Sequence, residues 1–280
     1  MVARRQGPEA PARARDAEHA PPAAALGPPS AKEWLYGRNA VREALRGPRR
    51  PYRLWLAEGG RRSGIVGEIL QWAGRRGVRA EERPADELTK LVGPVNHQGV
   101  VLLADAYAYA QLDDLLDQTR PAPPLFLLLD SLQDPQNFGT LLRTAEAVGV
   151  TGVLIPEHRQ VGVTPAVVNA SAGAVEHLAV ARVVNLARTI ERLKAAGAWV
   201  AGLEQAAGAL VPWEADLLGA LALVVGSEGE GISRLVREQC DFLLALPMAG
   251  RIASLNAAVA GSVVLYEVVR QRQARAGSRQ

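Results

Sequence analysis

The sequence predicts an α/β protein in which a small basic domain precedes a larger domain built on a parallel sheet. From residue 125 onward, short continuous apolar runs alternate with segments of helix length, as expected for parallel strands buried on both faces. Residues 32–83 hold thirteen Lys/Arg against six Asp/Glu, whereas residues 84–280 hold fifteen against twenty. This asymmetry indicates one part that binds a polyanion and another that performs chemistry. The simpler alternative is that the arginines only solvate the surface.

Composition narrows the classes of function further. The 280 residues are 48% hydrophobic, which is enough for two domains with their own cores. No apolar stretch reaches the roughly 18 residues that span a membrane, and the N-terminus lacks a secretory apolar region, so we expect a cytoplasmic protein without a membrane partner. We also expect no metal, because the chain has one cysteine, Cys240, and its histidines lack ligand spacing: His19, His97, His158 and His177.

The chain divides into four parts. Residues 1–31, rich in Ala, Pro and Arg, are predicted to form a disordered tail. The small domain covers 32–105, with helices expected at 39–46, 65–73 and 86–91 and strands at 53–56, 78–80 and 99–104. Residues 106–124 are a predicted linker with a short helix at 112–116. The large domain, 125–280, is expected to have strands at 125–129, 152–155, 178–183, 199–203, 221–225 and 242–246.

The first segment that can carry chemistry follows the strand at 125–129 and enters a helix. Asn137 is the expected N-cap of this helix and Gly149 its expected end, and Arg143 projects from the side opposite the apolar face. In open α/β sheets, ligands bind where strand ends meet helix N-termini, and free amides there suit an anion. Taken alone, an ordinary cap with a solvated arginine explains the segment more simply.

The second segment is a glycine loop at 226–231, again between a strand and a helix. Its order, G-x-x-G-x-G, differs from the dinucleotide fingerprint, and no Lys-Ser/Thr pair follows it as in a P-loop. A nicotinamide-dependent oxidoreductase would also need an acidic residue about 20 positions after an early fingerprint, so we exclude that class. A tight structural turn is an equally good interpretation of the loop by itself.

The third segment joins the strand at 242–246 to a long helix that is expected to reach about residue 272. Ser254 is the expected N-cap of this helix. The first turns of the helix are rich in small residues, which allow another backbone to approach closely: Ala257, Ala258, Ala260, Gly261 and Ser262. That neighbour is either the protein's own sheet or a second subunit.

Together, the three segments resemble the SpoU/TrmH branch of the SPOUT RNA methyltransferases. The matching motifs are Asp134-Pro135-x-Asn137-x-Gly139-x-x-x-Arg143, Gly226-x-Glu228-Gly229-x-Gly231, and Leu246-Pro247-Met248 with Ser254-Leu255-Asn256. Three further motifs extend the resemblance to residues 36–272 and are similar to bacterial enzymes that methylate a guanosine 2′-hydroxyl in 23S ribosomal RNA: Tyr36–Val41, His97–Val100 and Ser171–His177. The adenosine methyltransferases of thiostrepton resistance share this architecture and are the alternative.

The resemblance implies a C-terminal trefoil knot, a homodimer and S-adenosyl-L-methionine as cofactor. Backbone around Gly226, Leu246 and Leu255 would hold the cofactor. The catalytic pocket, shared across the dimer, would contain Arg143, Asn137, Glu228, Ser254 and Asn256. The small domain would capture ribosomal RNA, and the candidate contacts are Arg38, Arg42, Arg49, Arg50, Arg61 and Arg62. We expect Glu176 and His177 to be structural and leave them out of the site.

Methyl transfer to a ribose hydroxyl needs an oriented oxygen and the loss of its proton. The family assigns the base role to the arginine that corresponds to Arg143, assisted by an RNA phosphate. A guanidinium pKa exceeds about 12 and a nearby phosphate raises it, so a second role is equally defensible: Arg143 clamps the phosphate and orients the hydroxyl. A non-catalytic RNA-binding assembly factor is the remaining alternative, and the intact pocket motifs argue against it.

Overall fold

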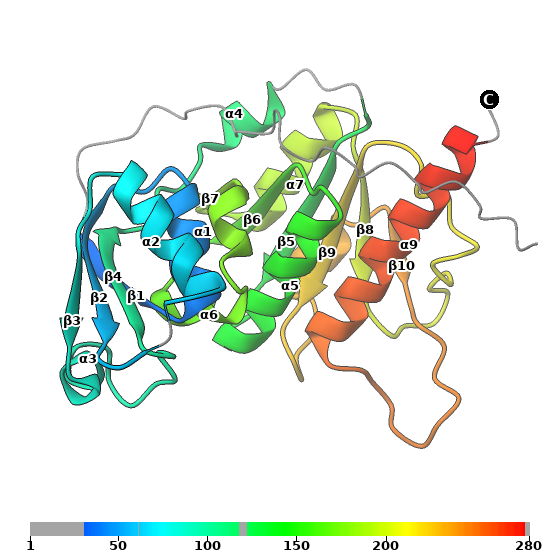
Figure 1. Ribbon diagram of the computed structural model, residues 1–280. Coiled ribbons are helices and arrows are strands. Elements are labelled where there is room, and N and C mark those ends of the chain that lie inside the picture. Colours follow the sequence, from blue (N-terminus) through cyan, green and yellow to red (C-terminus); the bar gives the residue numbers. More distant parts are fainter. Residues whose placement is uncertain (1–30, 61, 118–121, 278–280) are drawn as a thin grey trace, which may run out of the picture.

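The computed structural model describes residues 31–60, 62–117 and 122–277, and these residues form two sheets (Figure 1). The predicted disordered tail, residues 1–31, lies outside the described residues apart from Ala31. Among the described residues, no helix is long and apolar enough to cross a membrane.

The first sheet has four strands in the order β1-β4-β2-β3. Strand β4 (Val100–Asp105) pairs antiparallel with β1 (Lys32–Tyr36) and β2 (Pro51–Ala57), and β2 pairs parallel with β3 (Ala80–Arg83). The helices of this part are α1 (Arg38–Arg46), α2 (Ile65–Arg75) and α3 (Ala85–Val92). Helix α1 buries its apolar face at Ala40, Val41, Ala44 and Leu45.

The sequence pattern missed β1 and misplaced β3. Strand β1 has one fully buried residue, Leu35, and it lies at the edge of the sheet, so it lacks the continuous apolar run of a central strand. The expected strand at 78–80 lies instead at 80–83, where three of the four residues are exposed. Both errors therefore fall on edge strands, where burial imposes little pattern.

The second sheet has six strands, all parallel, in the order β10-β8-β9-β5-β6-β7. This confirms the parallel sheet predicted from the apolar runs. The strands are β5 (Leu125–Asp130), β6 (Gly152–Pro156), β7 (Val180–Val183), β8 (Trp199–Leu203), β9 (Leu221–Gly226) and β10 (Phe242–Leu244). The predicted short helix before this sheet is α4 (Leu112–Leu116).

Helices cover both faces of the large sheet. One face carries α5 (Pro135–Ala147), α6 (Pro165–Ala170), the 3-10 helix η1 (Ala174–His177) and α9 (Ala257–Gly277), with α5 and α9 side by side (Figure 1). The other face carries α7 (Leu186–Ala195) and α8 (Arg234–Glu238). Along β5, Leu125, Leu127 and Leu129 face the first layer and Phe126 and Leu128 face the second. Burial on both sides explains why the run is continuously apolar.

Candidate active site

A cavity of about 500 Å³ opens where strands β8, β9 and β10 end. The strands are parallel, so their carboxyl ends meet at one edge of the sheet, which is where open α/β sheets bind ligands. The structure brings six of the eight predicted site residues to this cavity: Gly226, Glu228, Leu246, Ser254, Leu255 and Asn256. Asn137 contacts this group, and Arg143 is the exception.

The glycine loop folds back on the end of β9. Ser227 and Gly231 exchange two backbone hydrogen bonds, each 3.1 Å long. A Cβ on Gly226 would lie 2.2 Å from the carbonyl carbon of Gly231, so position 226 accepts only glycine in this conformation. Gly226 is therefore required by the closure of the loop itself, which sets Glu228 at the rim of the cavity.

One side chain, Asn256, connects the three predicted motifs. Its Nδ2 donates to Oδ1 of Asn137 at 2.8 Å and to a carboxylate oxygen of Glu228. Its Oδ1 accepts from the backbone amide of Val259 at 3.1 Å. The start of α5, the glycine loop and the start of α9 are thereby joined at a single amide group.

The prediction that Asn137 caps α5 is wrong. The cap is Asp134, whose carboxylate accepts from the amides of Gln136 at 3.2 Å and Asn137 at 3.0 Å, with Pro135 in the first turn. Asn137 instead lies inside the first turn, nearly buried, and its side chain is available to Asn256. Gly149 follows the last turn of α5 with φ +73°, as expected for a helix end.

The prediction that Ser254 caps the last helix is also wrong, because Asn256 occupies the cap position. Ser254 lies two residues earlier, exposed at the cavity. The small residues behind the cap pack against the protein's own core, since a Cβ on Gly261 would lie 2.7 Å from Leu141 and 3.2 Å from Val225.

Arg143 does not line the cavity. It projects from the exposed face of α5 and makes no hydrogen bond or ion pair with other residues that the structure describes. Thr144 Oγ1 and Ser262 Oγ lie 2.8 Å apart, which places this part of α5 directly beside α9. Arg143 is therefore an available cation next to that helix.

The cavity itself is acidic. Glu204, Glu228 and Glu230 line it, and no Lys or Arg of the described chain does. Such a lining favours a cationic group over a phosphate. No group of three His, Cys, Asp or Glu residues that could hold a metal ion occurs in the described ranges.

Two polar lining residues that follow β8 were absent from the predicted site. Gln205 donates from Nε2 to the carbonyl of Leu246 at 2.6 Å, and Glu204 forms an ion pair with Arg237 at 2.9 Å. Both follow β8, whose end carries no recognisable motif, so only the order of strands in the sheet could have indicated them.

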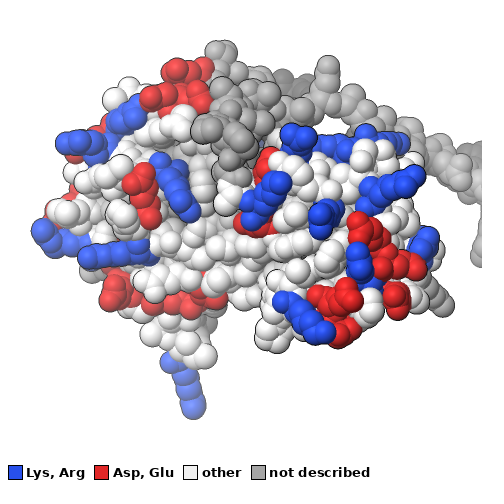
Figure 2. All heavy atoms as spheres, turned by 90° about the vertical axis from the view of Figure 1, so that its left-hand side faces the viewer, with Lys and Arg blue, Asp and Glu red and all other residues white. Residues whose placement is uncertain are grey.

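Among the candidate RNA contacts, Arg49 is a wrong prediction because its side chain is only 3% exposed and lies between two carboxylates. Arg38 and Arg50 are exposed, whereas Arg42 and Arg62 each form ion pairs with glutamates. Arg61 lies outside the described residues. Figure 2 shows basic and acidic side chains interspersed on this end of the molecule rather than one continuous basic patch.

Glu176 and His177, which we predicted to be structural, do not line the cavity. Glu176 is completely buried and accepts from Arg49 Nε at 2.8 Å. His177 Nε2 lies 2.8 Å from a carboxylate oxygen of Glu43.

Comparisons with known proteins agree with this geometry. The family model described as SpoU rRNA Methylase matches residues 124–266, and that described as RNA 2′-O ribose methyltransferase substrate binding matches residues 34–110. YacO of Bacillus subtilis, assigned to the TrmH family of tRNA/rRNA methyltransferases, is 46% identical over 242 residues, covering 86% of this chain and 96% of YacO.

Solved structures show the same likeness. The SpoU methyltransferase AviRb of Streptomyces viridochromogenes, in complex with AdoMet, is 27% identical with a TM-score of 0.71, covering 86% of this chain and 90% of AviRb. An AdoMet-bound rRNA methyltransferase of Sinorhizobium meliloti is 25% identical with a TM-score of 0.70, over 86% and 87% of the two chains. With its fold, its cavity motifs and the matches to both domains, the chain belongs to the SpoU rRNA methylase family of RNA methyltransferases.

Proposed function

We propose that this protein transfers a methyl group from S-adenosyl-L-methionine to the 2′-hydroxyl of a guanosine in 23S ribosomal RNA. The observation that carries the proposal is the junction at Asn256, which holds Asn137 and Glu228 together at an acidic cavity on the carboxyl edge of the sheet. A match to the substrate-binding model of RNA 2′-O ribose methyltransferases supports ribose as the acceptor.

The cavity suits the cofactor on chemical grounds. Bound there, the cofactor supplies a methyl group on a positively charged sulfonium. The carboxylates of Glu228 and Glu230 favour that charge, and the side chains of Leu246 and Leu255 offer apolar surface for an adenine ring. The glycine loop allows backbone groups to approach the ligand closely.

The acceptor oxygen must be oriented for attack, and no Lys or Arg of the described residues lines the acidic cavity to pair with an RNA phosphate. Arg143 is the exposed cation on the helix that also carries Asn137. A phosphate beside it raises rather than lowers the guanidinium pKa. We therefore assign Arg143 the role of clamping the phosphate next to the target ribose, with the hydroxyl proton lost late in the transfer.

A homodimer would bring Arg143 to a cavity. Val259, Val263 and Tyr266 form a stripe along α9 and are 48%, 44% and 55% exposed, which is typical of a surface that another chain covers. This stripe lies beside the part of α5 that carries Arg143. We propose that two copies pack through α5 and α9, so that Arg143 of each copy serves its partner's cavity. We also propose that the C-terminal domain contains the trefoil knot that the family resemblance implies.

The shared site has a direct test by mixing two impaired variants, Arg143→Ala and Asn256→Ala, at a cofactor concentration below the parent Kd, where each variant alone has little activity. If Arg143 acts on the partner's cavity, half of the randomly exchanged dimers contain one intact site, and about a quarter of the parent activity returns. If both residues act within one chain, mixing restores nothing. Light scattering coupled to gel filtration on each sample checks that dimers form.

The reaction is tested by mixing the purified protein with radiolabelled S-adenosyl-L-methionine and undermethylated large-subunit RNA, then mapping the label. We expect label at a guanosine 2′-oxygen, its loss in Arg143→Ala, and its retention in Arg188→Ala, an exposed arginine on the opposite face of the sheet. Label on adenosine would change only the substrate. RNA binding without any label would favour a non-catalytic assembly factor.

A further inference from the structure

The two domains meet around one segment, residues 169–177, which includes the 3-10 helix η1. Asn169 Nδ2 donates to the carbonyl of Tyr36 at 3.0 Å, and His177 reaches Glu43 on α1. A single apolar cluster also spans the boundary, since it contains Leu35 and Val41 of the small domain together with Val168 of the large one. The domains therefore share a packed interface as well as a linker.

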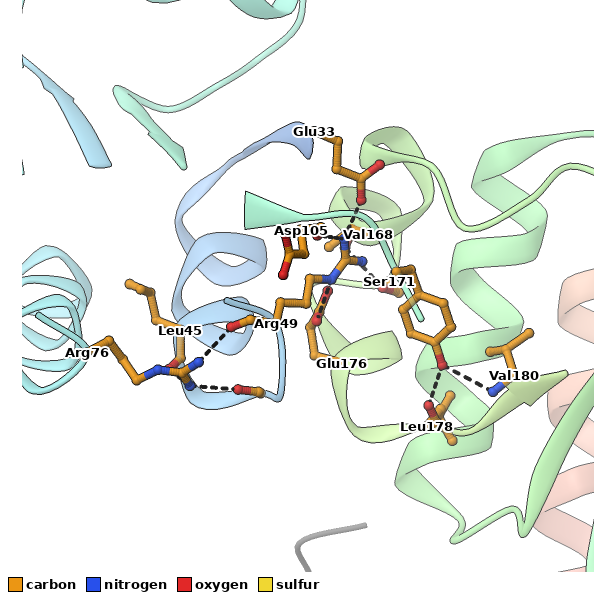
Figure 3. Close-up of polar contacts among 12 residues, drawn as sticks. Glu33, Leu45, Arg49, Arg76, Asp105, Val168, Ser171, Glu176, Leu178 and Val180 are labelled. Carbon is orange, nitrogen blue, oxygen red and sulfur yellow. Dashed lines mark hydrogen bonds and ion pairs between the residues drawn. The ribbon is translucent and has the colours of Figure 1, made fainter. Parts of the chain in front are cut away.

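An ion triad is buried in this interface. Figure 3 shows Arg49, from the loop after α1, between Glu33 of β1 and Glu176 of η1. Its side chain is 3% exposed and that of Glu176 is 0% exposed. Burial lowers the pKa of Arg49, but the charges of Glu176 and Glu33 outweigh this, and the pKa is raised, so the guanidinium stays charged. A buried pair of this kind loses much stability when one partner is removed.

The position of Arg49 is fixed from its own domain. Arg49 Nη1 donates to the carbonyl of Asp105 at 3.1 Å. Arg76 of the loop after α2 donates to the carbonyls of Arg49 at 2.6 Å and Gly47 at 2.8 Å (Figure 3). Contacts within the small domain therefore fix the position of the Arg49 guanidinium, and Glu176 of the large domain pairs with that guanidinium.

The same segment packs tightly on the helix of Arg143. A Cβ on Gly139 of α5 would lie 2.4 Å from the Cβ of Ala170 and 2.8 Å from the amide nitrogen of Ser171. Residues 169–177 thus lie between the small domain and α5, with direct contact on both sides. Because both contacts are tightly packed, a displacement of the small domain is expected to displace α5 as well.

We propose that Arg49 and Glu176 are positioning residues that lock the RNA-binding domain to α5 and so determine which nucleotide of the captured RNA reaches Arg143. This inference rests on the proposed function for its substrate, but its structural part is independent of any reaction. It predicts one fixed distance between the domains, maintained by the buried pair.

The structural part is tested by spin labels at Glu81→Cys and Glu191→Cys, exposed sites on the two domains, in the full-length protein. The labelled protein is first exchanged with an excess of unlabelled protein, so that a labelled chain pairs with an unlabelled one and only the distance within one chain is measured. Burial raises the pKa of the native Cys240 to about 11, so this thiol reacts slowly with the label. We expect one narrow distance distribution in the parent and a broad one in Glu176→Gln. A broad distribution in the parent, or a narrow one in both, overturns the lock.

The functional part is tested with Gly47→Cys and Glu176→Cys, because a Cβ on Gly47 would lie 3.1 Å from the Cβ of Glu176, slightly closer than the usual disulfide range of about 3.5–4.5 Å. We expect Glu176→Cys alone to lower kcat/KM for RNA at least about tenfold or to spread label over neighbouring nucleotides. The Kd for cofactor should stay within about twofold, since the cavity is untouched. Oxidation of the double variant should restore parental rate and position, and reduction should remove them again.

Asp86→Asn, which breaks an exposed ion pair inside the small domain, is the matched control and should behave as the parent. Parental rate and methylation position in Glu176→Cys would refute the positioning role. If the parent itself transfers no methyl group, the proposed function fails while the spin-label distances still decide whether the domains are locked.

Discussion

The proposed site, which combines Arg143 of α5 with Glu228 at the cavity, and the buried triad at the domain interface contain the same residue types but differ in burial. Arg143 and Glu228 are exposed, and Arg143 has no partner among the described residues. Arg49 and Glu176 are buried and paired with each other. The difference shows that an arginine is available to a ligand when it is exposed and not already paired with a carboxylate. A basic stretch of sequence does not reveal which of its arginines are already paired.

The largest effect on stability is expected at the triad. Arg49→Ala leaves Glu176 buried without its partner and should lower the free energy of unfolding by about 3–5 kcal/mol. Urea denaturation followed by circular dichroism measures the loss. The double variant Arg49→Met, Glu176→Leu should recover part of it because the fully buried carboxylate is removed together with its partner, and only Glu33, whose side chain is 18% exposed, remains without Arg49. A loss below about 1 kcal/mol in Arg49→Ala would remove the distinction between the two regions.

Arg143→Ala, in contrast, should slow the reaction strongly and change the stability little. Removing the cation that clamps the phosphate and so orients the acceptor hydroxyl should slow methyl transfer by about 10²-fold. The free energy of unfolding should change by no more than about 0.5 kcal/mol, since the side chain is exposed and unpaired. Single-turnover kinetics and urea denaturation on one preparation give both values. A stability loss comparable to that of Arg49→Ala would contradict this assignment.

Asn256 combines the roles of the two regions, because it caps α9 and also joins Asn137 to Glu228 at the cavity. Asn256→Ala removes the cap oxygen and should cost about 1 kcal/mol of stability. Asn256→Asp keeps that oxygen but loses the donor to Asn137 and places a second carboxylate beside Glu228. We expect both variants to bind the cofactor at least about tenfold more weakly in calorimetry, with the stability loss confined to Ala. Equal stability losses would show that the amide donor also holds the fold.

The smallest effect is expected at His177 and Glu43. The hydrogen bond to Glu43 raises the pKa of His177 although burial opposes the shift. Burial acts to raise the pKa of Glu43, but the hydrogen bonds from His177 and Arg42 outweigh it and the pKa is lowered. The histidine contribution is complete below its unfolded pKa of about 6.5 and is lost as pH rises through the folded pKa, and the glutamate contribution is lost as pH falls through its lowered pKa.

The stability difference between the parent and His177→Gln should therefore be greatest between about pH 4.5 and 6.5, at about 1 kcal/mol, and should shrink in alkaline solution. Urea midpoints at pH 5.5 and pH 9 measure it. A difference that grows with pH would mean that the histidine is neutral in the folded protein.

The sequence by itself determined the large sheet and most of the cavity. Parallel strands with helices on both faces must be apolar along their whole length, so the runs at 125–129 and 221–225 indicate the sheet directly. The carboxyl ends of such strands meet at one edge, so motifs that follow separate strands converge there. The resemblance to the SpoU/TrmH branch placed Asn137 and Asn256 in one site, and the convergence of strand ends is the physical reason why residues so far apart in the sequence can meet.

Only the tertiary structure decided how polar groups are shared. The caps of α5 by Asp134 and of α9 by Asn256 are local contacts, which the sequence pattern assigned to the wrong residues. The hydrogen bond between Asn137 and Asn256, in contrast, joins two distant segments that only the packing of α5 beside α9 brings together. Arg49 was expected on an RNA-facing surface, yet its partner Glu176 lies 127 residues away. Local patterns report whether a segment is buried, but the pairing of charges across a domain interface depends on contacts between distant segments, which no local pattern contains.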